Sequence, residues 1–338
     1  MRRRGRGPAG PFLRRALAAA LLAASFGATA LADDGFPDWL AGLRAEAAAR
    51  GVSAATLDAA LTGLAPVPRV VELDRKQPER TMRFEQYLAR VVTDSRVARG
   101  RDLFRRHRDL FARVGQEYGV PGRFVVALWG IETDFGRNTG GFDVIAALAT
   151  LAHDGRRSAY FRTELLDALE ILDQGHVARR DMRGSWAGAM GQCQFMPSSF
   201  LRHAVDYDGD GRRDIWGTLP DVAASAANYL KASGWDGRWT WGREVRLPSG
   251  FDVSLARAGA GAAAAGTERA LGEWQRLGVR RPDGSDLPQA DLAASLILPD
   301  GAGGRAFLVY ANYDAVLRWN RSLYFATAVG LLADRIGR

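Results

Sequence analysis

The residue with the clearest chemical potential is Glu132, which lies near the end of an apolar segment from Val125 to Gly136. The segment's pattern predicts a helix that Pro121 opens near its first turn and Gly136 closes. Side chains three and four positions apart are neighbours on a helix. For Glu132 these neighbours are apolar, aromatic or small: Leu128, Trp129, Phe135 and Gly136.

Such surroundings would change the acidity of Glu132. Burial disfavours the charged form of a carboxyl and raises its pKa, and a carboxyl that keeps its proton near neutral pH can act as a general acid. Asp134 is only two positions away, so it points elsewhere and cannot pair with Glu132. A structural Glu bonded to the backbone at a helix end remains the alternative interpretation.

A second stretch, from Asp206 to Asp214, has the spacing of a cation-binding loop. Asp206, Asp208 and Asp210 alternate along it, and a glycine occupies the sixth position. Alternating carboxylates can converge on one hard cation such as Ca²⁺, and the glycine permits the sharp turn. Arg212 would contribute its backbone carbonyl at position 7. An acidic turn that needs only solvent is the alternative.

The calcium pattern departs from the usual loop at its twelfth position. Gly217 stands where a bidentate Glu is expected, and Asp221 could complete the site through a longer loop. The expected role is structural, because these carboxylates have no evident reacting partner.

A third stretch, from Gly184 to Pro197, is rich in small residues. Its glycines and alanines let a ligand approach the backbone closely, and Ser185, Gln192 and Gln194 offer hydrogen bonds. The composition suits the wall of a groove for a polar chain such as a sugar, with a plain packing loop as the alternative. We find no serine-hydrolase elbow, phosphate loop or paired-cysteine motif.

The N-terminus predicts export. Residues 1–32 combine basic residues, an apolar stretch and the Ala30–Ala32 cleavage pattern of a signal peptide, whose apolar run is short for a membrane span. This segment carries six arginines and no acid, so removing it lowers the net charge from +8 to +2. Nucleic acid is therefore not an implied partner. Cys193 is the only cysteine, which excludes an intramolecular disulfide and a lipidation cysteine at the cleavage site.

Periodicity and caps predict a mainly helical chain with one partly β region. Gly63 to Val71, which contains two prolines, reads as an extended linker. The expected strands are 244–247, 295–298 and 307–310, and a low-complexity patch spans Gly259 to Gly266. The expected helices are 38–49, 53–61, 81–95, 102–118, 121–136, 143–153, 159–174, one from Ser198, 221–233 with Asp221 as its cap, and 320–336.

Together these motifs resemble the lytic murein transglycosylase B family. The resemblance rests on Trp129 to Gly136, Ser185 to Ser199, the acidic loop at Asp206, Asn228 to Lys231, and Trp319 to Ser322. It covers nearly the whole chain after the signal, and the combination is more specific than any single motif.

The resemblance implies a fold and a domain organisation. The fold class would be mainly α (α+β), with a lysozyme-like helical core, an α-rich N-terminal region and a small inserted β domain. The expected parts are a signal peptide (1–32), an N-terminal helical region (33–119), the catalytic core (120–240), the β insertion (241–306) and a C-terminal segment that completes the core (307–338).

The resemblance also implies residue roles. Glu132 falls where the family has its catalytic acid and base, and the acidic loop resembles an EF-hand-like calcium site with the ligands Asp206, Asp208, Asp210, Arg212 and Asp221. No organic cofactor is expected. The glycan- or peptide-contacting positions are Tyr87, Arg156, Arg157, Ser185, Gln194, Tyr229, Trp319 and Asn320.

The implied activity is cleavage of the β-1,4 bond between N-acetylmuramic acid and N-acetylglucosamine in peptidoglycan, with formation of 1,6-anhydromuramoyl ends. Two alternatives stay open. One is a hydrolase (muramidase) that uses water and a second carboxylate such as Asp134, Asp143 or Asp154. The other is a non-catalytic glycan-binding protein. The expected location is the periplasm, without a stable membrane span, and the expected partners are peptidoglycan strands, with cell-wall synthesis proteins as an open addition.

Overall fold

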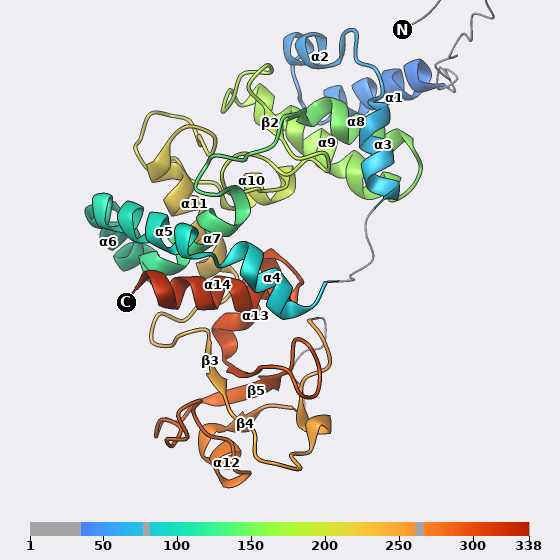
Figure 1. Cartoon of the computed structure of the whole chain (residues 1–338). Helices are drawn as coiled ribbons and strands as arrows, with labels where there is room; N and C mark the ends of the chain where they lie inside the picture. The colour runs from blue at the N-terminus through green and yellow to red at the C-terminus, as the bar shows by residue number, and fades with distance from the viewer. Residues whose placement is uncertain (1–34, 77–81, 261–266, 338) are drawn as a thin grey trace, which may run out of the picture. The chain divides into compact units, whose positions relative to one another are not determined.

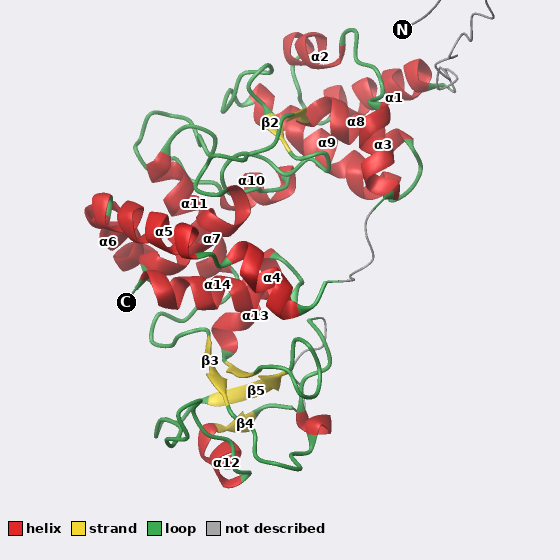
Figure 2. Cartoon of the chain, in the orientation of Figure 1, coloured by secondary structure: helices red, strands yellow, loops and turns green. Residues whose placement is uncertain are grey.

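The computed structural model describes residues 35–76, 82–260 and 267–337, and these residues form one compact unit from Gly35 onward. The expected signal peptide lies outside the described residues, as does most of the low-complexity patch. Helices dominate and strands are confined to two small sheets (Figures 1 and 2), which confirms the predicted mainly α class with a small β part.

The first part of the chain is helical. Its helices are α1 (Phe36–Ala49), α2 (Ala54–Leu61), α3 (Pro68–Arg75), α4 (Phe84–Val91), α5 (Asp94–Arg106) and α6 (Arg108–Tyr118). Ser53 caps α2 as predicted, because its side chain accepts a hydrogen bond from the Thr56 N–H at 3.3 Å.

Three predictions for this region were wrong in detail. The linker from Gly63 to Val71 is not extended throughout, because Pro68 begins α3, where its missing N–H costs no helical hydrogen bond. The helix expected to reach residue 95 ends at Val91, and Thr93 caps a new helix by accepting from the Arg96 N–H at 3.2 Å. The helix expected over 102–118 is interrupted at His107.

Helix α7 (Gly122–Thr133) lies at the centre of the fold and carries Glu132. Nine of its twelve residues are buried, and it packs against α5, α6, α11 and α14. It ends at Thr133, before the expected Gly136, because Asp134 and Phe135 adopt left-handed backbone angles, with φ of 51° and 61°. Positive φ is costly for residues with a Cβ, so packing must hold this turn in place directly after Glu132.

The second half of the chain supplies six more helices to the core, of which α11 and α14 pack against α7. It contains α8 (Val144–His153), α9 (Ser158–Asp173), α10 (Pro197–His203), α11 (Leu219–Ala232), α13 (Ala311–Trp319) and α14 (Leu323–Ile336). Asp143 caps α8 through the Ala146 N–H at 2.9 Å. The cap expected at Asp221 was wrong, since Thr218 precedes α11 and Asp221 lies buried in its first turn. The last helix begins at Leu323, later than expected at 320, after a cap by Ser322.

The larger sheet has the strand order β3–β6–β5–β4 and is antiparallel throughout. Its strands are β3 (Gly242–Val245), β4 (Arg269–Ala270), β5 (Ala293–Ile297) and β6 (Ala306–Val309), with the 3₁₀ turn η1 (Val253–Leu255) and helix α12 (Leu271–Arg276) nearby. The second sheet pairs β1 (Phe142–Asp143) with β2 (Arg183–Gly184).

Side chains of β6 alternate between two hydrophobic cores. Leu308 belongs to a small core with Trp274 of α12, whereas Phe307 belongs to the large helical core and meets Phe84 edge-on at 6.0 Å. This alternation is expected of a strand buried on both faces. It ties the β region to the helical core through packing as well as through the chain.

Candidate active site

The Glu132 carboxyl lies at the end of α7 and forms one direct side-chain hydrogen bond, in which the Trp319 Nε1–H donates to Oε1 at 2.8 Å. Glu132 as a residue is only partly buried, yet protein atoms crowd its carboxyl. Burial raises the pKa of Glu132 to about 7, against the opposing effect of the Trp319 hydrogen bond. The carboxyl can therefore hold a proton near neutral pH and also release it.

Aromatic side chains surround this carboxyl. The Trp319 ring lies 4.8 Å from the ring of Tyr229 and 5.1 Å from that of Phe195, measured between centroids. Burial, with the charge of Glu132 as a second cause, raises the pKa of Tyr87 to about 12. The structure thus brings Tyr87, Tyr229 and Trp319 of the predicted contact residues to the surroundings of Glu132, and Asn320 follows Trp319 at an exposed position.

The loop after β2 places Ser185 and Gln194 on a tight, hydrogen-bonded turn. The Ser185 Oγ accepts from the backbone N–H groups of Ala187 and Ala189 at 3.3 and 3.0 Å. Because a hydroxyl has one proton and two acceptor sites, these bonds leave its proton as the group to donate to a ligand. Gln194, at φ 51°, donates its amide to the carbonyls of Thr139 and Gly191 at 3.0 and 2.9 Å, which leaves its carbonyl oxygen as an acceptor.

Gln192 holds this loop to α7, a role that the sequence analysis did not assign. Its Oε1 accepts from the Trp129 indole at 2.8 Å, and its backbone carbonyl accepts from the Thr133 hydroxyl at 3.0 Å. Its amide and backbone N–H donate to the carbonyls of Trp216 and Ile215, each at 2.8 Å. A Cβ at Gly136 would collide with its amide, so this position must remain glycine. Only the composition of the loop hinted at this clamp.

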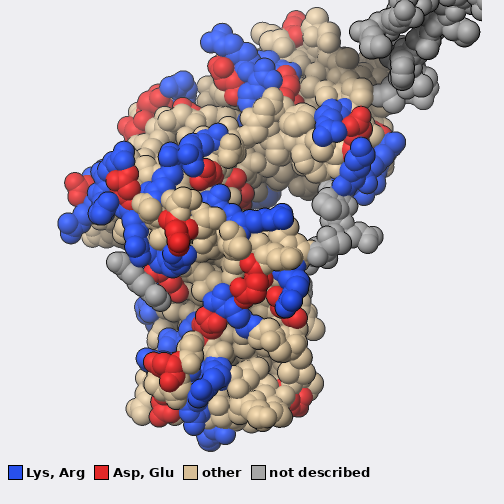
Figure 3. Space-filling view, viewed as in Figure 1, with Lys and Arg blue, Asp and Glu red and all other residues tan. Residues whose placement is uncertain are grey.

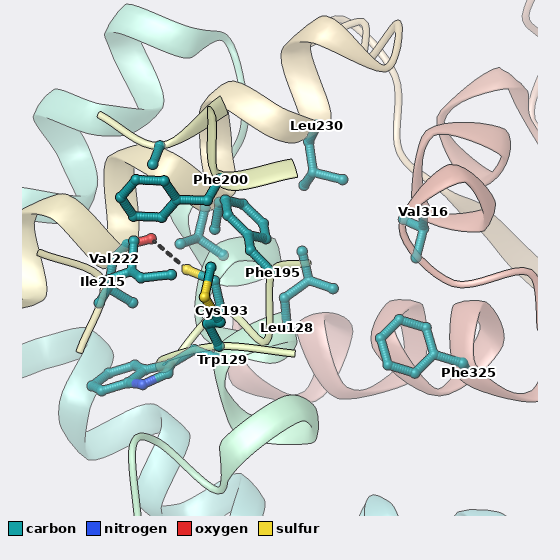
Figure 4. Packing of buried hydrophobic residues seen from close by; sticks show 14 of the residues in the cluster. Leu128, Trp129, Cys193, Phe195, Phe200, Ile215, Val222, Leu230, Val316 and Phe325 are labelled. Carbon is teal, nitrogen blue, oxygen red and sulfur yellow. Dashed lines mark hydrogen bonds between the residues drawn. The ribbon is translucent and has the colours of Figure 1, made fainter. Parts of the chain in front are cut away.

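The interior next to the carboxyl is closely packed. Figure 4 shows Cys193 among Leu128, Trp129 and Val222, with its Sγ 3.4 Å from the carbonyl oxygen of Val222. A cavity of about 10 Å³ lies beside Glu132 and these residues, which is room for one water at most. Cys193 is buried and free, and burial raises the pKa of its thiol.

The carboxylates considered as a second catalytic acid are each held elsewhere. Asp134 pairs with Arg137 and lies 3.6 Å from Arg96. Asp143 caps α8 and pairs with Arg179 at 2.6 Å, and Asp154 pairs with Arg75 at 2.8 Å. Each of these carboxylates thus already has a cationic partner.

Arg156 and Arg157 meet a different partner. Both contact the buried Asp74, with N–O distances of 2.6 and 2.7 Å, and Arg156 lowers the pKa of that carboxyl. About half of each arginine side chain is exposed. In the described residues no contact joins this pair to the Glu132 surroundings, so it forms a separate cationic position beside α3 and α9.

The acidic loop gathers three of its predicted ligands. Carboxylate oxygens of Asp206, Asp208 and Asp210 lie within 4.8 Å of one another. Asp206 accepts from the N–H groups of Gly209 and Gly211 at 2.8 and 2.9 Å, so the loop is already curved around its carboxylate. This donor set fits a hard cation that prefers oxygen ligands.

The remaining two predicted ligands are the backbone carbonyl of Arg212 and the carboxylate of Asp221. The Arg212 guanidinium pairs with Asp210 at 2.9 Å and lowers the pKa of that carboxyl. Asp221 is fully buried, and its two oxygens accept from the backbone N–H groups of Tyr207 and Asp214 at 2.8 and 2.7 Å. In this structure Asp221 closes the loop at its two ends and is not part of the three-carboxylate cluster.

Charges on the face shown in Figure 3 are mixed, with arginines and lysines interspersed among acidic side chains. No helix among the described residues is both long enough and apolar enough to cross a bilayer.

The helical fold, with one shielded carboxyl at the end of its central helix, is that of the lysozyme-like class of enzymes. Comparison with known proteins gives the particular family. The chain belongs to the family described as transglycosylase SLT domain, which it matches over residues 35–334.

Named relatives agree with this family. The chain is 32% identical over 257 residues to the membrane-bound lytic murein transglycosylase B of Escherichia coli, covering 74% of this chain and 66% of that protein. SltB3 of Pseudomonas aeruginosa, solved in complex with NAG-NAM-pentapeptide, is 46% identical with a TM-score of 0.85, covering 89% of this chain and 79% of that chain. The lytic transglycosylase Slt35 of Escherichia coli, solved with calcium, is 27% identical with a TM-score of 0.74, covering 88% of this chain and 92% of that chain.

Proposed function

We propose that the protein is a lytic murein transglycosylase that cleaves the β-1,4 bond between N-acetylmuramic acid and N-acetylglucosamine and leaves a 1,6-anhydromuramoyl end. The observation that carries this proposal is the shielded Glu132 carboxyl, whose pKa is raised to about 7. The family supports it, and SltB3 has also been solved with NAG-anhNAM-pentapeptide.

In the proposed mechanism Glu132 acts twice. Its protonated carboxyl first gives a proton to the glycosidic oxygen as the bond to C1 breaks, while the N-acetyl group of the muramic acid stabilises the positive charge that develops. The resulting carboxylate then takes the proton from the C6 hydroxyl of the same sugar, and the C6 oxygen bonds to C1. Glu132 ends protonated, as it began. A nucleophile within the substrate has a high effective concentration, so water is not needed.

The surrounding residues would bind and orient the glycan. Ser185 has its proton free for an acetamido oxygen, and Gln194 has a carbonyl oxygen free for a sugar hydroxyl or N–H. Tyr87, Tyr229 and Asn320 would contact the same glycan. Arg156 and Arg157 would bind a carboxylate of the stem peptide, because each keeps an exposed edge while Asp74 holds it in place.

A hydrolytic muramidase would need a second carboxylate to activate water. Asp134, Asp143 and Asp154 are each paired with an arginine, which restrains the position of the carboxylate. This arrangement favours the one-carboxylate mechanism over the hydrolytic one.

We also propose that the loop from Asp206 to Asp210 binds Ca²⁺ in a structural role. Its three clustered carboxylates would be ligands together with the Arg212 carbonyl, and Asp221 would hold the loop ends or join the site on binding. A bound ion would offset the mutual repulsion of these carboxylates.

The location and partners follow from the same reasoning. Export by the predicted signal peptide would bring the enzyme to its peptidoglycan strands in the periplasm. Cell-wall synthesis proteins there are further candidate partners.

Digestion of purified peptidoglycan in H₂¹⁸O, with mass analysis of the fragments, tests the reaction. We expect muropeptide ends that are one water lighter than hydrolytic ends and contain no ¹⁸O. Glu132→Gln should release no fragments while it still sediments with peptidoglycan. Ends that carry ¹⁸O would establish a hydrolase, and unchanged release by Glu132→Gln would remove Glu132 from the chemistry.

A further inference from the structure

The hydrogen bond between Trp319 and Glu132 can form in one direction only, from the indole to the carboxyl. An indole N–H can donate a hydrogen bond but cannot accept one. It donates to Oε1 at 2.8 Å. In a neutral carboxyl the carbonyl oxygen is a stronger acceptor than the hydroxyl oxygen, so this bond favours the form of Glu132 whose proton is on Oε2, the oxygen that Trp319 does not contact.

This direction does not change when Glu132 ionises. The carboxylate oxygen accepts the same indole N–H, so the bond can persist while the proton leaves Oε2 and later returns there. A reaction in which one carboxyl acts as acid and then as base requires that the carboxyl keep its orientation between the two transfers. The Trp319 N–H, which can only donate, meets this requirement by holding Oε1 in both charge states.

Trp319 is itself held firmly enough to impose an orientation. It is the last residue of α13, and its ring packs on Tyr229 and Phe195. The Tyr229 hydroxyl donates to the carbonyl of the adjacent Arg318 at 2.7 Å, and the Asn320 N–H donates to the carbonyl of Val316 at 3.1 Å. The indole therefore reaches Glu132, 187 positions earlier in the sequence, from a fixed position.

We infer that Trp319 is a positioning residue that confines the catalytic proton to Oε2 of Glu132 and directs it toward the scissile bond. The inference rests on the proposed acid and base role of Glu132 and goes beyond the expectation that Trp319 only contacts glycan. The same bond favours the charged form of Glu132, so it limits how far burial can raise the pKa of the carboxyl.

The sharpest test removes only the N–H. Site-specific replacement of Trp319 by 3-benzothienylalanine keeps the bicyclic ring and puts sulfur in place of the donor. We expect kcat on a soluble glycan substrate to fall on the order of ten- to a hundred-fold with little change in KM. Without this donor the Glu132 carboxylate is less stable and its pKa rises. The basic limb of the kcat/KM profile, which follows this pKa, should therefore move to higher pH. Trp319→Phe should move the limb in the same direction.

The chain offers a matched control. Trp241 also donates its indole N–H to a carboxylate, at 3.1 Å to Asp334 Oδ2, but it is buried in the core and lines neither Glu132 nor the Ser185 loop. The same replacement at residue 241 should leave the pH profile and kcat near those of the unmodified enzyme.

Two results would overturn the inference. An increase in KM with an unchanged basic limb would make Trp319 a sugar-stacking surface alone, and unchanged kinetics would give the N–H no role. Neither result touches the proposed function, which fails separately if the unmodified enzyme yields hydrolytic ends or if Glu132→Gln keeps its activity.

Discussion

The Glu132 site and the acidic loop contain the same functional group in opposite surroundings. At the end of α7 one carboxyl lies among aromatic rings with one donor, and burial raises its pKa to about 7. In the loop three carboxylates stand within 4.8 Å of one another, and two of them are exposed. Backbone N–H groups donate to Asp206, and the Arg212 guanidinium pairs with Asp210.

The difference shows that surroundings decide what a carboxylate can do. Isolation among apolar groups makes a proton carrier, because the neutral form is favoured there. Crowding of carboxylates favours a bound cation, because a positive ion relieves their mutual repulsion. Gln192 joins the two regions, since it bonds both to α7 and to the segment that follows the loop.

The contrast between the Glu132 site and the acidic loop fails if Glu132 does not carry the catalytic proton. Glu132→Gln removes the titrating group and keeps the shape, and we expect kcat to fall roughly 10²- to 10⁴-fold, the range of general acid–base catalysis. Asp134→Asn is the matched control two residues away. Its carboxylate pairs with arginines, so turnover should stay within several-fold. Comparable losses in both variants, measured as fragment release, would contradict the assignment.

The shielding of Glu132 should also appear in stability. Its folded pKa of about 7 exceeds the ordinary value of 4.5, so the folded state binds this proton more tightly than the unfolded state. This contribution is fully present below pH 4.5 and is lost as the pH rises through 7. Relative to the unmodified protein, Glu132→Gln should gain at most about 3 kcal/mol of unfolding free energy between pH 4 and pH 8. Urea titrations at both pH values measure it, and a pH-independent difference would mean that the carboxyl is well solvated.

The acidic loop should respond to calcium. An ion bound only by the folded state at a free concentration of 100 times Kd adds about 2.7 kcal/mol and raises Tm, and a chelator should reverse the shift. The double variant Asp206→Asn/Asp208→Asn should lose the response. Asp181→Asn, an exposed acid beside Arg180, should keep it. If calcium does not change the Tm of the unmodified protein, the loop is a solvated turn and not a calcium site.

Gln192 links the two regions, and Gln192→Leu should lower the stability of the fold. This change removes two side-chain hydrogen bonds and leaves the Trp129 indole N–H without its acceptor. An unsatisfied buried donor costs about 1–3 kcal/mol, and we expect a loss of that size in chemical unfolding. A loss below about 0.5 kcal/mol would show that the clamp is dispensable.

Sequence patterns predicted most of the helices because caps and periodicity are local signals. Ser53 caps a helix where expected, a helix was expected from Asp143, and the apolar face of α7 was evident from spacing alone. The predictions were wrong where a residue type is common in two different local structures. Pro68 reads as a linker residue but begins a helix, and Asp221 reads as a cap but has its carboxylate drawn to the N–H groups of a loop.

The site itself was only partly predictable. Glu132 stands out because its helical neighbours are apolar, but its bond to Trp319 joins residues 187 positions apart and depends on how α13 packs. Trp235 and Trp241 are buried in the core, which their positions in the sequence do not indicate. The separation of the Arg156–Arg157 pair from Glu132 is likewise a matter of tertiary packing, which local patterns do not encode.

The central claim is that Glu132 holds its proton near neutral pH, and titration of that single carboxyl tests it most directly. Infrared difference spectra between the unmodified protein and Glu132→Gln isolate its C=O band. We expect a protonated-carboxyl band at pH 6 that disappears with a midpoint near pH 7. A midpoint near 4.5, the value of a solvated glutamate, would contradict the account.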